Sequence, residues 1–161
     1  MATSTRKRLI DCALEVLAAE GVDAVTVRRV ARAAGISHGA PLRHFPSRAA
    51  LLSTVAATGF AELSTRLALA GADALAERAP GQRLTAVCES YVDFARGGPA
   101  LFELMFQRAM ASSGVAAFEQ FRAFVPASDL VATALWAALR GLALSPDADA
   151  LLAVTLAAYV R

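Results

Sequence analysis

Cysteine is scarce in this sequence, with only Cys12 and Cys88 among 161 residues. Both fall within helical apolar patterns, so we expect two small core residues in a reducing compartment and no disulfide framework. A chain of this length buries a sizeable core without disulfides or structural metals. The expected location is therefore the cytoplasm.

Long apolar runs are also lacking. The longest stretch without a charge, residues 49–61, is well short of the roughly 18 apolar residues that indicate a membrane span. At the N-terminus a basic cluster precedes an apolar stretch, as in signal peptides, but Asp11 and Glu15 interrupt that stretch. We expect neither a transmembrane segment nor export.

Strand-forming patterns are scarce as well, because few β-branched runs are flanked by turn residues. Hydrophobic residues make up 57% of the sequence, and much of this share is alanine and leucine, which favour helices. Apolar residues recur at helical spacing, and Thr26, Ser37 and Ser47 are suitable N-caps. The expected helices cover about 4–20, 26–35, 37–45, 47–78, 84–96, 99–110, 116–125, 128–142 and 146–159. Pro80-Gly81 and Gly114 are expected to separate helices. The sequence thus predicts an all-α protein.

The second and third expected helices are joined by the residues AAGIS, 33–37. Glycine provides a sharp turn, Ile36 enters the core and Ser37 caps the next helix, which is helix-turn-helix geometry. In such motifs the second helix enters the major groove of DNA with its N-terminal residues at base edges. The residues at this helix start are His38, Gly39, Ala40 and Pro41. Gly39 and Ala40 permit a close approach, Ala40 or Pro41 suits a thymine methyl group, and His38 suits a base or a phosphate.

Other chemistry for these residues is less well supported. Charge favours the N-terminal end, because residues 1–50 carry eight Lys/Arg and four Asp/Glu. His38 and His44 have no cysteine or acidic neighbour at metal-ligand spacing, so DNA contact is favoured over a metal site and over solvated surface histidines. Glu89 and Asp93 share a helix face, but we expect them to be solvated or paired with Arg96. We therefore predict no enzyme activity, no metal and no cofactor.

Residues 5–52, TRKRLIDCALEVLAAEGVDAVTVRRVARAAGISHGAPLRHFPSRAALL, resemble the DNA-binding domain of the TetR family of bacterial transcriptional repressors. The resemblance rests on the helix end at Gly21, the turn from Val30 to Ser37, and His44-Phe45 closing the third helix. It implies phosphate contacts from Thr26, His44 and Arg48, the last at a position where lysine is usual. Base contacts are implied for Arg28, His38, Gly39, Ala40 and Pro41.

Leu42 departs from this family pattern, because a tyrosine is usual two residues before His44. The hydroxyl contact of that tyrosine is lost, so DNA affinity is lower or Arg43 compensates. Ser37, Leu42 and Arg43 complete the expected DNA-binding set. For Arg6, Lys7 and Arg8, a solvated terminus and a phosphate-contacting arm remain equal alternatives.

The segments YVDFARGGPALFELMF (91–106) and LWAALRGLAL (135–144) resemble the ligand-binding half of a TetR branch named for a Trp-x-x-x-His-Gly pattern. Trp136 and Gly141 match this pattern, while Arg140 occupies the histidine position. A helical bundle with many aromatic and methionine side chains and few polar ones suits an apolar or amphipathic ligand between its helices. The expected ligand-binding residues are Tyr91, Phe94, Phe102, Met105, Phe106, Phe121, Phe124, Trp136 and Arg140. Each aromatic taken singly suits the core, but together they suit a ligand site between helices. Arg140 either faces solvent or binds an anionic group.

We accordingly expect a three-helix helix-turn-helix domain (1–46), followed by a roughly six-helix ligand-binding and dimerisation domain (47–161). The expected function is that of a TetR-type repressor, released from a palindromic double-stranded DNA operator by a small molecule. Its homodimer would form through the last two helices, where the following residues belong to the core or the interface: Leu135, Leu139, Leu152, Leu156 and Tyr159. The alternatives are a ligand-independent DNA-binding protein and a helical small-molecule carrier.

Overall fold

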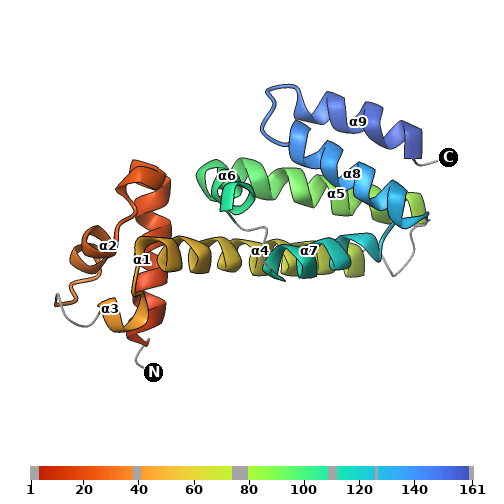
Figure 1. Ribbon diagram of the computed structural model, residues 1–161. Helices are drawn as coiled ribbons and strands as arrows, with labels where there is room; N and C mark the ends of the chain where they lie inside the picture. Colours follow the sequence, from red (N-terminus) through yellow and green to blue (C-terminus); the bar gives the residue numbers. More distant parts are fainter. Residues whose placement is uncertain (1–3, 38–40, 74–79, 109–111, 126, 160–161) are drawn as a thin grey trace. The chain divides into compact units, whose positions relative to one another are not determined.

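The computed structural model describes residues 4–37, 41–73, 80–108, 112–125 and 127–159, whose regular structure is entirely helical (Figure 1). The expected all-α class is therefore confirmed. The helices are α1 (Thr5–Glu20), the 3₁₀ helix η1 (Val22–Ala24), α2 (Val27–Ala33), α3 (Pro41–His44), α4 (Arg48–Asp73), α5 (Pro80–Gly97), α6 (Pro99–Arg108), α7 (Ser112–Arg122), α8 (Asp129–Leu142) and α9 (Ala148–Tyr159). No described helix is long and apolar enough to cross a membrane.

The chain forms two compact units. The first unit contains Met1–Gly59 and Ala100–Met110, and the second contains Phe60–Pro99 and Ala111–Arg161. Helix α4 contributes residues to both units. The expected division into a DNA-binding domain up to residue 46 and a ligand-binding and dimerisation domain from residue 47 stays a prediction.

In the first unit, local signals fix the ends of α1 and α2. Ser4 caps α1, and Gly21, at φ 81°, ends it through a hydrogen bond from its backbone N–H to the carbonyl oxygen of Leu17 at 3.0 Å. Thr26 caps α2 as predicted, because its Oγ1 accepts the Arg29 backbone N–H at 3.1 Å. Gly35 has φ 65°, which glycine adopts without strain, and it forms the turn after α2.

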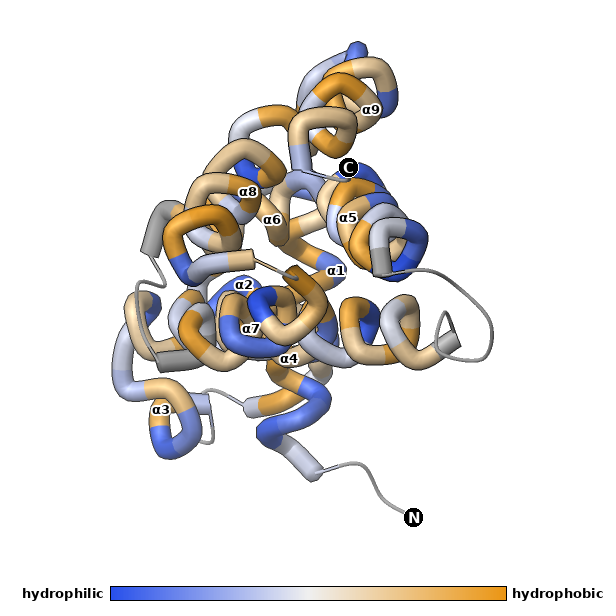
Figure 2. Tube along the Cα trace, turned by 90° about the vertical axis from the view of Figure 1, so that its right-hand side faces the viewer, coloured by the Kyte–Doolittle hydropathy of each residue, from blue (hydrophilic) through white to orange (hydrophobic). Residues whose placement is uncertain are grey.

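The core of the second unit lies between α5, α8 and α9, which contact one another. These helices bury one side each, and apolar segments recur along α8 and α9 in Figure 2. Leu135, Leu139, Leu152 and Leu156, which the sequence left between core and interface, are at most 7% exposed and belong to this core. Burial also raises the pKa of Cys88 to about 12, so its thiol is protonated at neutral pH.

Two expected separators instead lie inside helices. Pro80-Gly81 forms the first turn of α5, where proline is tolerated because the first-turn N–H groups have no partner within the helix. Gly114 lies within α7, which begins at Ser112 rather than at residue 116. An internal glycine disfavours a helix by only about 1 kcal/mol, and the burial of Ala117 and Phe121 on this helix outweighs that amount.

Helix α4 has two glycines against which large side chains lie directly. A Cβ at Gly59 would be 2.6 Å from the Met105 sulfur, and a Cβ at Gly71 would be 2.1 Å from the ring of Phe124. No side chain fits at such separations without a shift of its neighbour. Both glycines therefore serve close approach rather than a turn, and a side chain at either position would require Met105 or Phe124 to shift.

Candidate functional site

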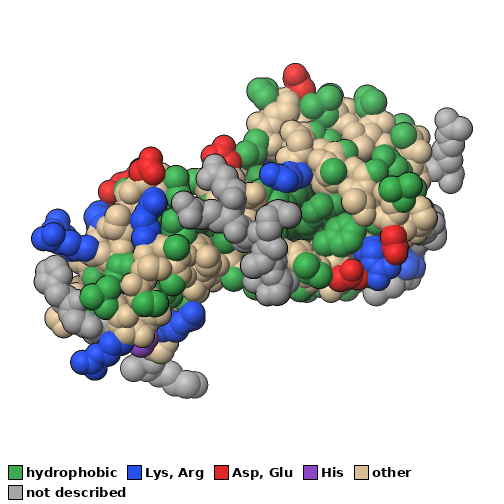
Figure 3. Space-filling view, in the orientation of Figure 1, with side chains coloured by type: hydrophobic (Ala, Val, Ile, Leu, Met, Phe, Trp, Pro, Cys, Tyr) green, Lys and Arg blue, Asp and Glu red, His purple; other side chains and the backbone are tan. Residues whose placement is uncertain are grey.

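The helix-turn-helix segment presents an exposed basic surface. Arg28 and Arg32 on α2 and Arg43 on α3 are exposed, and among the described residues they have no ion pair or hydrogen bond through their side chains. His44, at the end of α3, is exposed as well. Figure 3 shows Lys and Arg side chains around this part of the first unit. Arg28, Arg32 and Arg43 are therefore available to bind an anionic partner such as the DNA backbone.

The predicted base-contacting residues are described only in part. His38, Gly39 and Ala40 lie outside the described residues. Pro41 begins α3 and is buried, so it supports the helix from inside. Leu42 is 57% exposed beside Arg43, so α3 offers an apolar side chain where the family has a tyrosine. Ser37 is exposed, and its capping role stays a prediction.

Thr26 has the geometry for a phosphate contact. Its Oγ1 accepts one backbone N–H at the start of α2, so its own hydroxyl proton is available for donation. Neighbouring Arg29 is not available, because it is paired with Glu20. A capped helix start with a free hydroxyl donor is a suitable phosphate site.

Several other cations predicted near DNA have partners inside the first unit. The Arg48 guanidinium donates from Nε to the Val25 carbonyl oxygen at 2.9 Å and from Nη2 to that of Val22 at 2.6 Å. Arg8 Nη2 donates to the Ala34 carbonyl oxygen at 2.7 Å. Arg6 lies over the ring of Phe45, 5.3 Å from its centroid.

Lys7 in turn forms an ion pair with Asp11 at 2.7 Å. The basic N-terminal residues are thus held by the protein rather than only solvated. Phosphate contact by any of them, or by Arg48, stays a prediction.

Three of the expected ligand-binding residues come together in the second unit. The Trp136 ring lies 5.0 Å from Tyr91 and 5.2 Å from Phe121, measured between centroids. Phe118, which the sequence patterns did not single out, lies 5.7 Å from the same ring in an edge-to-face arrangement. The signal that could have found Phe118 is its position three residues before Phe121, on the same face of α7. These four residues form the aromatic cluster.

The other expected ligand-binding residues have further contacts of their own. Phe102 and Phe106 pack on each other in the first unit, 4.9 Å apart between centroids, and Met105 lies against Gly59. In the second unit Phe94 lies beneath the Arg66 guanidinium, and Phe124 lies against Gly71. That the nine residues form one ligand site stays a prediction.

Arg140 is exposed and acts electrostatically on the aromatic cluster. Burial raises the pKa of Tyr91 above its usual range, and the Arg140 charge partly opposes that increase. Tyr91 therefore stays protonated at neutral pH. A cation at this edge of the cluster is suitably placed for an anionic ligand group.

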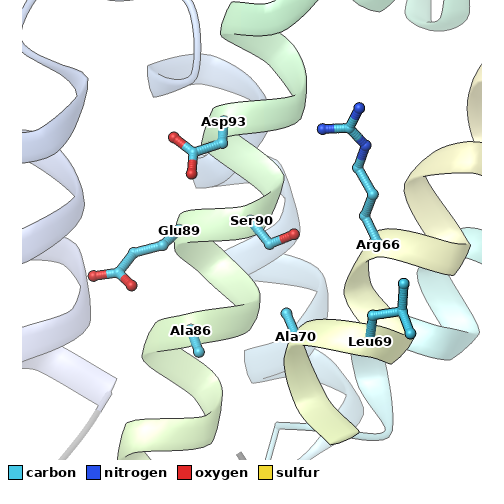
Figure 4. Close-up of a pocket in the computed structure, with 7 residues that line it drawn as sticks. All are labelled: Arg66, Leu69, Ala70, Ala86, Glu89, Ser90 and Asp93. Carbon is cyan, nitrogen blue, oxygen red and sulfur yellow. The ribbon is translucent and has the colours of Figure 1, made fainter. Parts of the chain in front are cut away.

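A surface hollow of about 400 Å³ lies between α4 and α5 (Figure 4). Its lining residues are Arg66, Leu69, Ala70, Ala86, Glu89, Ser90 and Asp93. Asp93 and Glu89 are exposed there, as the solvated alternative predicts. Arg96, their proposed partner, instead binds Asp149 with distances of 2.7 and 3.1 Å.

Two family models match the chain. The model "Bacterial regulatory proteins, tetR family" matches residues 9–55, and "Tetracyclin repressor-like, C-terminal domain" matches residues 84–160. The HTH-type transcriptional regulator SrpR of Pseudomonas putida is 44% identical over 57 residues, which cover 35% of this chain and 27% of that protein. The uncharacterized HTH-type transcriptional regulator TtgW of the same species is also 44% identical over 57 residues, 35% of this chain and 42% of its own. The chain thus spans less than half the length of either curated relative.

Solved structures match over nearly the whole chain. A protein of unknown function from Rhodococcus sp. RHA1 has a TM-score of 0.82 and 27% identity, covering 99% of this chain and 97% of its own. A putative tetR family transcription regulator from Shewanella sp. PV-4 has a TM-score of 0.66 and 14% identity, with coverages of 99% and 100%. At 14% identity, the likeness to the Shewanella structure concerns the fold alone.

Proposed function

The chain belongs to the TetR family of DNA-binding transcriptional regulators, which are not enzymes, and we propose that it is a repressor released from its operator by a small molecule. The observation that carries this proposal is the exposed surface of α2 and α3, where Arg28, Arg32 and Arg43 have no protein partner among the described residues. A cytoplasmic location is part of the proposal.

The proposal is tested by DNA binding over a series of salt concentrations. Fluorescence anisotropy would measure affinity for the DNA flanking the protein's own gene, with scrambled duplex as competitor. Saturable binding that resists the competitor and weakens with salt is expected. If scrambled duplex displaces the protein from this DNA as well as the same DNA unlabelled does, a ligand-independent, non-specific DNA-binding protein is favoured. If the protein binds no DNA even at low salt, a small-molecule carrier is favoured.

We expect the operator to be palindromic because the protein is proposed to act as a dimer. One short helix contacts too few bases for useful specificity, whereas two helices related by a two-fold axis contact two half-sites. The proposed interface is the exposed apolar side of α8 and α9, where Leu130, Leu151 and Val154 are 78%, 43% and 73% exposed. Figure 3 shows hydrophobic side chains spread over the surface of the second unit.

The proposed ligand is apolar or amphipathic, and the aromatic cluster is its proposed binding wall. Trp136 and Phe118 are half-buried, so the cluster has an accessible side. Trp136 is the single tryptophan of the sequence, so its fluorescence reports on this cluster alone. Dodecanoate and anilinonaphthalene sulfonate are suitable probes, since each joins an apolar body to an anion near Arg140. If neither probe changes the Trp136 fluorescence, the proposed ligand site is contradicted.

The continuous helix α4 is the proposed link between ligand and DNA. It begins at Arg48 in the first unit and continues to Asp73 in the second. A ligand that favours one position of α4 would alter DNA affinity, and DNA would then weaken ligand binding by the same factor, typically about 1–3 kcal/mol. Titrating the ligand with and without operator DNA measures both sides of this linkage.

Replacing Arg28 with alanine is expected to weaken operator binding by about 1–3 kcal/mol, because an arginine that contacts a base edge supplies about that much discrimination. The variant should lose its discrimination between base pairs at one position of the operator and keep it at the other positions. Anisotropy with operators substituted one base pair at a time measures it. Wild-type affinity for the operator would remove Arg28 from the contact surface.

Replacing His44 with alanine is expected to lower affinity for operator and scrambled duplex by the same factor. His44 is exposed at the end of α3, where a phosphate contact positions the helix without distinguishing bases. The loss should be about threefold to tenfold, the value of one ordinary hydrogen bond of about 0.7–1.4 kcal/mol. Parallel titrations with both duplexes measure it, and a loss confined to one base position would contradict a phosphate role.

A further inference from the structure

Arginines from two other helices bind the two ends of α2. Arg48, the first residue of α4, donates to the carbonyl oxygens of Val22 and Val25, and Val25 directly precedes the N-cap of α2. Arg8 on α1 donates to the carbonyl oxygen of Ala34, the C-cap of α2. The helix is therefore held at both its beginning and its end.

These bonds suit a positioning role. A guanidinium is planar and rigid, so donation through both Nε and Nη2 fixes its direction as well as its distance. The carbonyl oxygen of Ala34, at the C-terminal end of α2, lies outside the helical hydrogen-bond ladder and needs another donor. The Val22 carbonyl oxygen also accepts the Val25 N–H at 3.2 Å, so Arg48 adds a second bond there. A positive charge at the C-terminal end, as Arg8 supplies, also interacts favourably with the helix dipole.

Three of the four arginines on α2 and α3 behave differently, the fourth being Arg29, which is paired with Glu20. Arg28, Arg32 and Arg43 are exposed and, within the described ranges, make no side-chain hydrogen bond or ion pair. The guanidinium groups of Arg8 and Arg48 instead donate to backbone carbonyl oxygens, with nitrogen–oxygen distances of 2.6–2.9 Å. These five arginines thus divide into two that support α2 and three that have no partner among the described residues.

We propose that Arg8 and Arg48 are positioning residues that hold α2 at its two ends, and that Arg32 and Arg43 neutralise DNA phosphates instead. The second half of this assignment rests on the proposed DNA-binding function. The first half concerns the protein alone, and it departs from the phosphate contact that the family resemblance implies for Arg48. Because Arg48 begins α4, it also joins the position of α4 to the start of α2.

Salt dependence separates the two roles. Each phosphate that a protein cation neutralises adds about 0.9 to the slope of log affinity against log salt concentration. Removing a phosphate-binding arginine therefore lowers that slope by about 0.9 for each phosphate that is no longer neutralised. Removing a positioning arginine lowers affinity without changing the slope, because the number of released counterions is the same.

The test compares Arg48→Met and Arg8→Met with Arg43→Met as the matched control. Methionine retains an unbranched apolar stem but removes the charge and the donors. For Arg48→Met and Arg8→Met we expect about tenfold weaker DNA binding at every salt concentration, with a wild-type slope. For Arg43→Met we expect a slope lower by about 0.9 per phosphate.

Amide hydrogen exchange of the free protein gives a second readout that needs no DNA. The backbone N–H of Val30 and Ala34 are bonded within α2 at 2.9 Å each. Both should exchange faster in Arg48→Met and Arg8→Met than in the wild type, and at the wild-type rate in Arg43→Met. Should Arg48→Met not fold, Arg48→Lys serves the same test, since lysine keeps the charge but not the planar fork.

The outcomes are distinct. The positioning role would be overturned if Arg48→Met lowers the slope of log affinity against log salt concentration while the α2 amides exchange at the wild-type rate. It would also be overturned if Arg48→Lys keeps both the wild-type slope and the wild-type exchange rates. Faster exchange with an unchanged slope would support it. If the wild type binds no DNA, the proposed function fails, yet α2 exchange still decides whether Arg8 and Arg48 hold the helix.

Discussion

Val154→Arg should separate the proposed dimer into monomers and lower operator affinity by at least about 100-fold. Val154 is 73% exposed on α9, and Leu130 on α8 is 78% exposed. Enclosing an unpaired guanidinium in an apolar interface disfavours association by about 3–5 kcal/mol. Because each protomer then contacts one half-site alone, most of the affinity for a palindrome is lost with the dimer.

Sedimentation velocity would measure the oligomeric state, and anisotropy the operator affinity, on the same preparations. Leu69→Arg is the matched control, because Leu69 is an apolar residue 58% exposed on α4, outside the proposed interface. We expect the control to remain dimeric and to bind DNA normally. A Val154→Arg protein that sediments as a dimer would place the interface elsewhere.

Phe121→Ala is the second substitution with a large expected effect, a loss of about 3–5 kcal/mol in the free energy of unfolding. Phe121 has no exposed surface and its ring contacts Trp136. Its removal leaves a cavity beneath the aromatic cluster that the surrounding helices cannot fully close. If Phe121 lined an open ligand site instead, its truncation would change stability little and would mainly weaken ligand binding.

Urea denaturation followed by circular dichroism measures this loss independently of Trp136 fluorescence. Phe118→Ala is the control, because Phe118 contacts the same tryptophan but is only half-buried. It should lose less than half as much free energy of unfolding as Phe121→Ala. A loss below about 1 kcal/mol for Phe121→Ala would contradict its place in the core.

Local signals in the sequence predict much of the first unit. Thr26 and Ser47 are N-caps as expected, with Ser47 Oγ accepting the Ala50 N–H at 3.1 Å, and Gly21 and Gly35 have the positive φ that ends a helix. Each of these features depends on residues within a few positions of one another. Local sequence is sufficient for them because the hydrogen bonds they make are also local.

Long-range partners are what the sequence cannot supply. Arg48 binds carbonyl oxygens 23 and 26 residues away, and every residue has a carbonyl group, so no side-chain pattern marks these acceptors. On α8 and α9 apolar residues occupy both the buried and the exposed sides. Periodicity therefore could not distinguish Leu135 in the core from Leu130 on the surface.

The two glycines of α4 limit how that helix can move. Met105 and Phe124 each lie where a neighbouring Cβ would not fit. Val55 and Leu67 precede Gly59 and Gly71 by four residues on the same faces of the helix, so a slide of about one turn, about 5.4 Å, would bring these larger side chains to Met105 and Phe124. Gly59 and Gly71 thus disfavour sliding of α4, so a tilt of the helix is the movement that fits its proposed link between ligand and DNA.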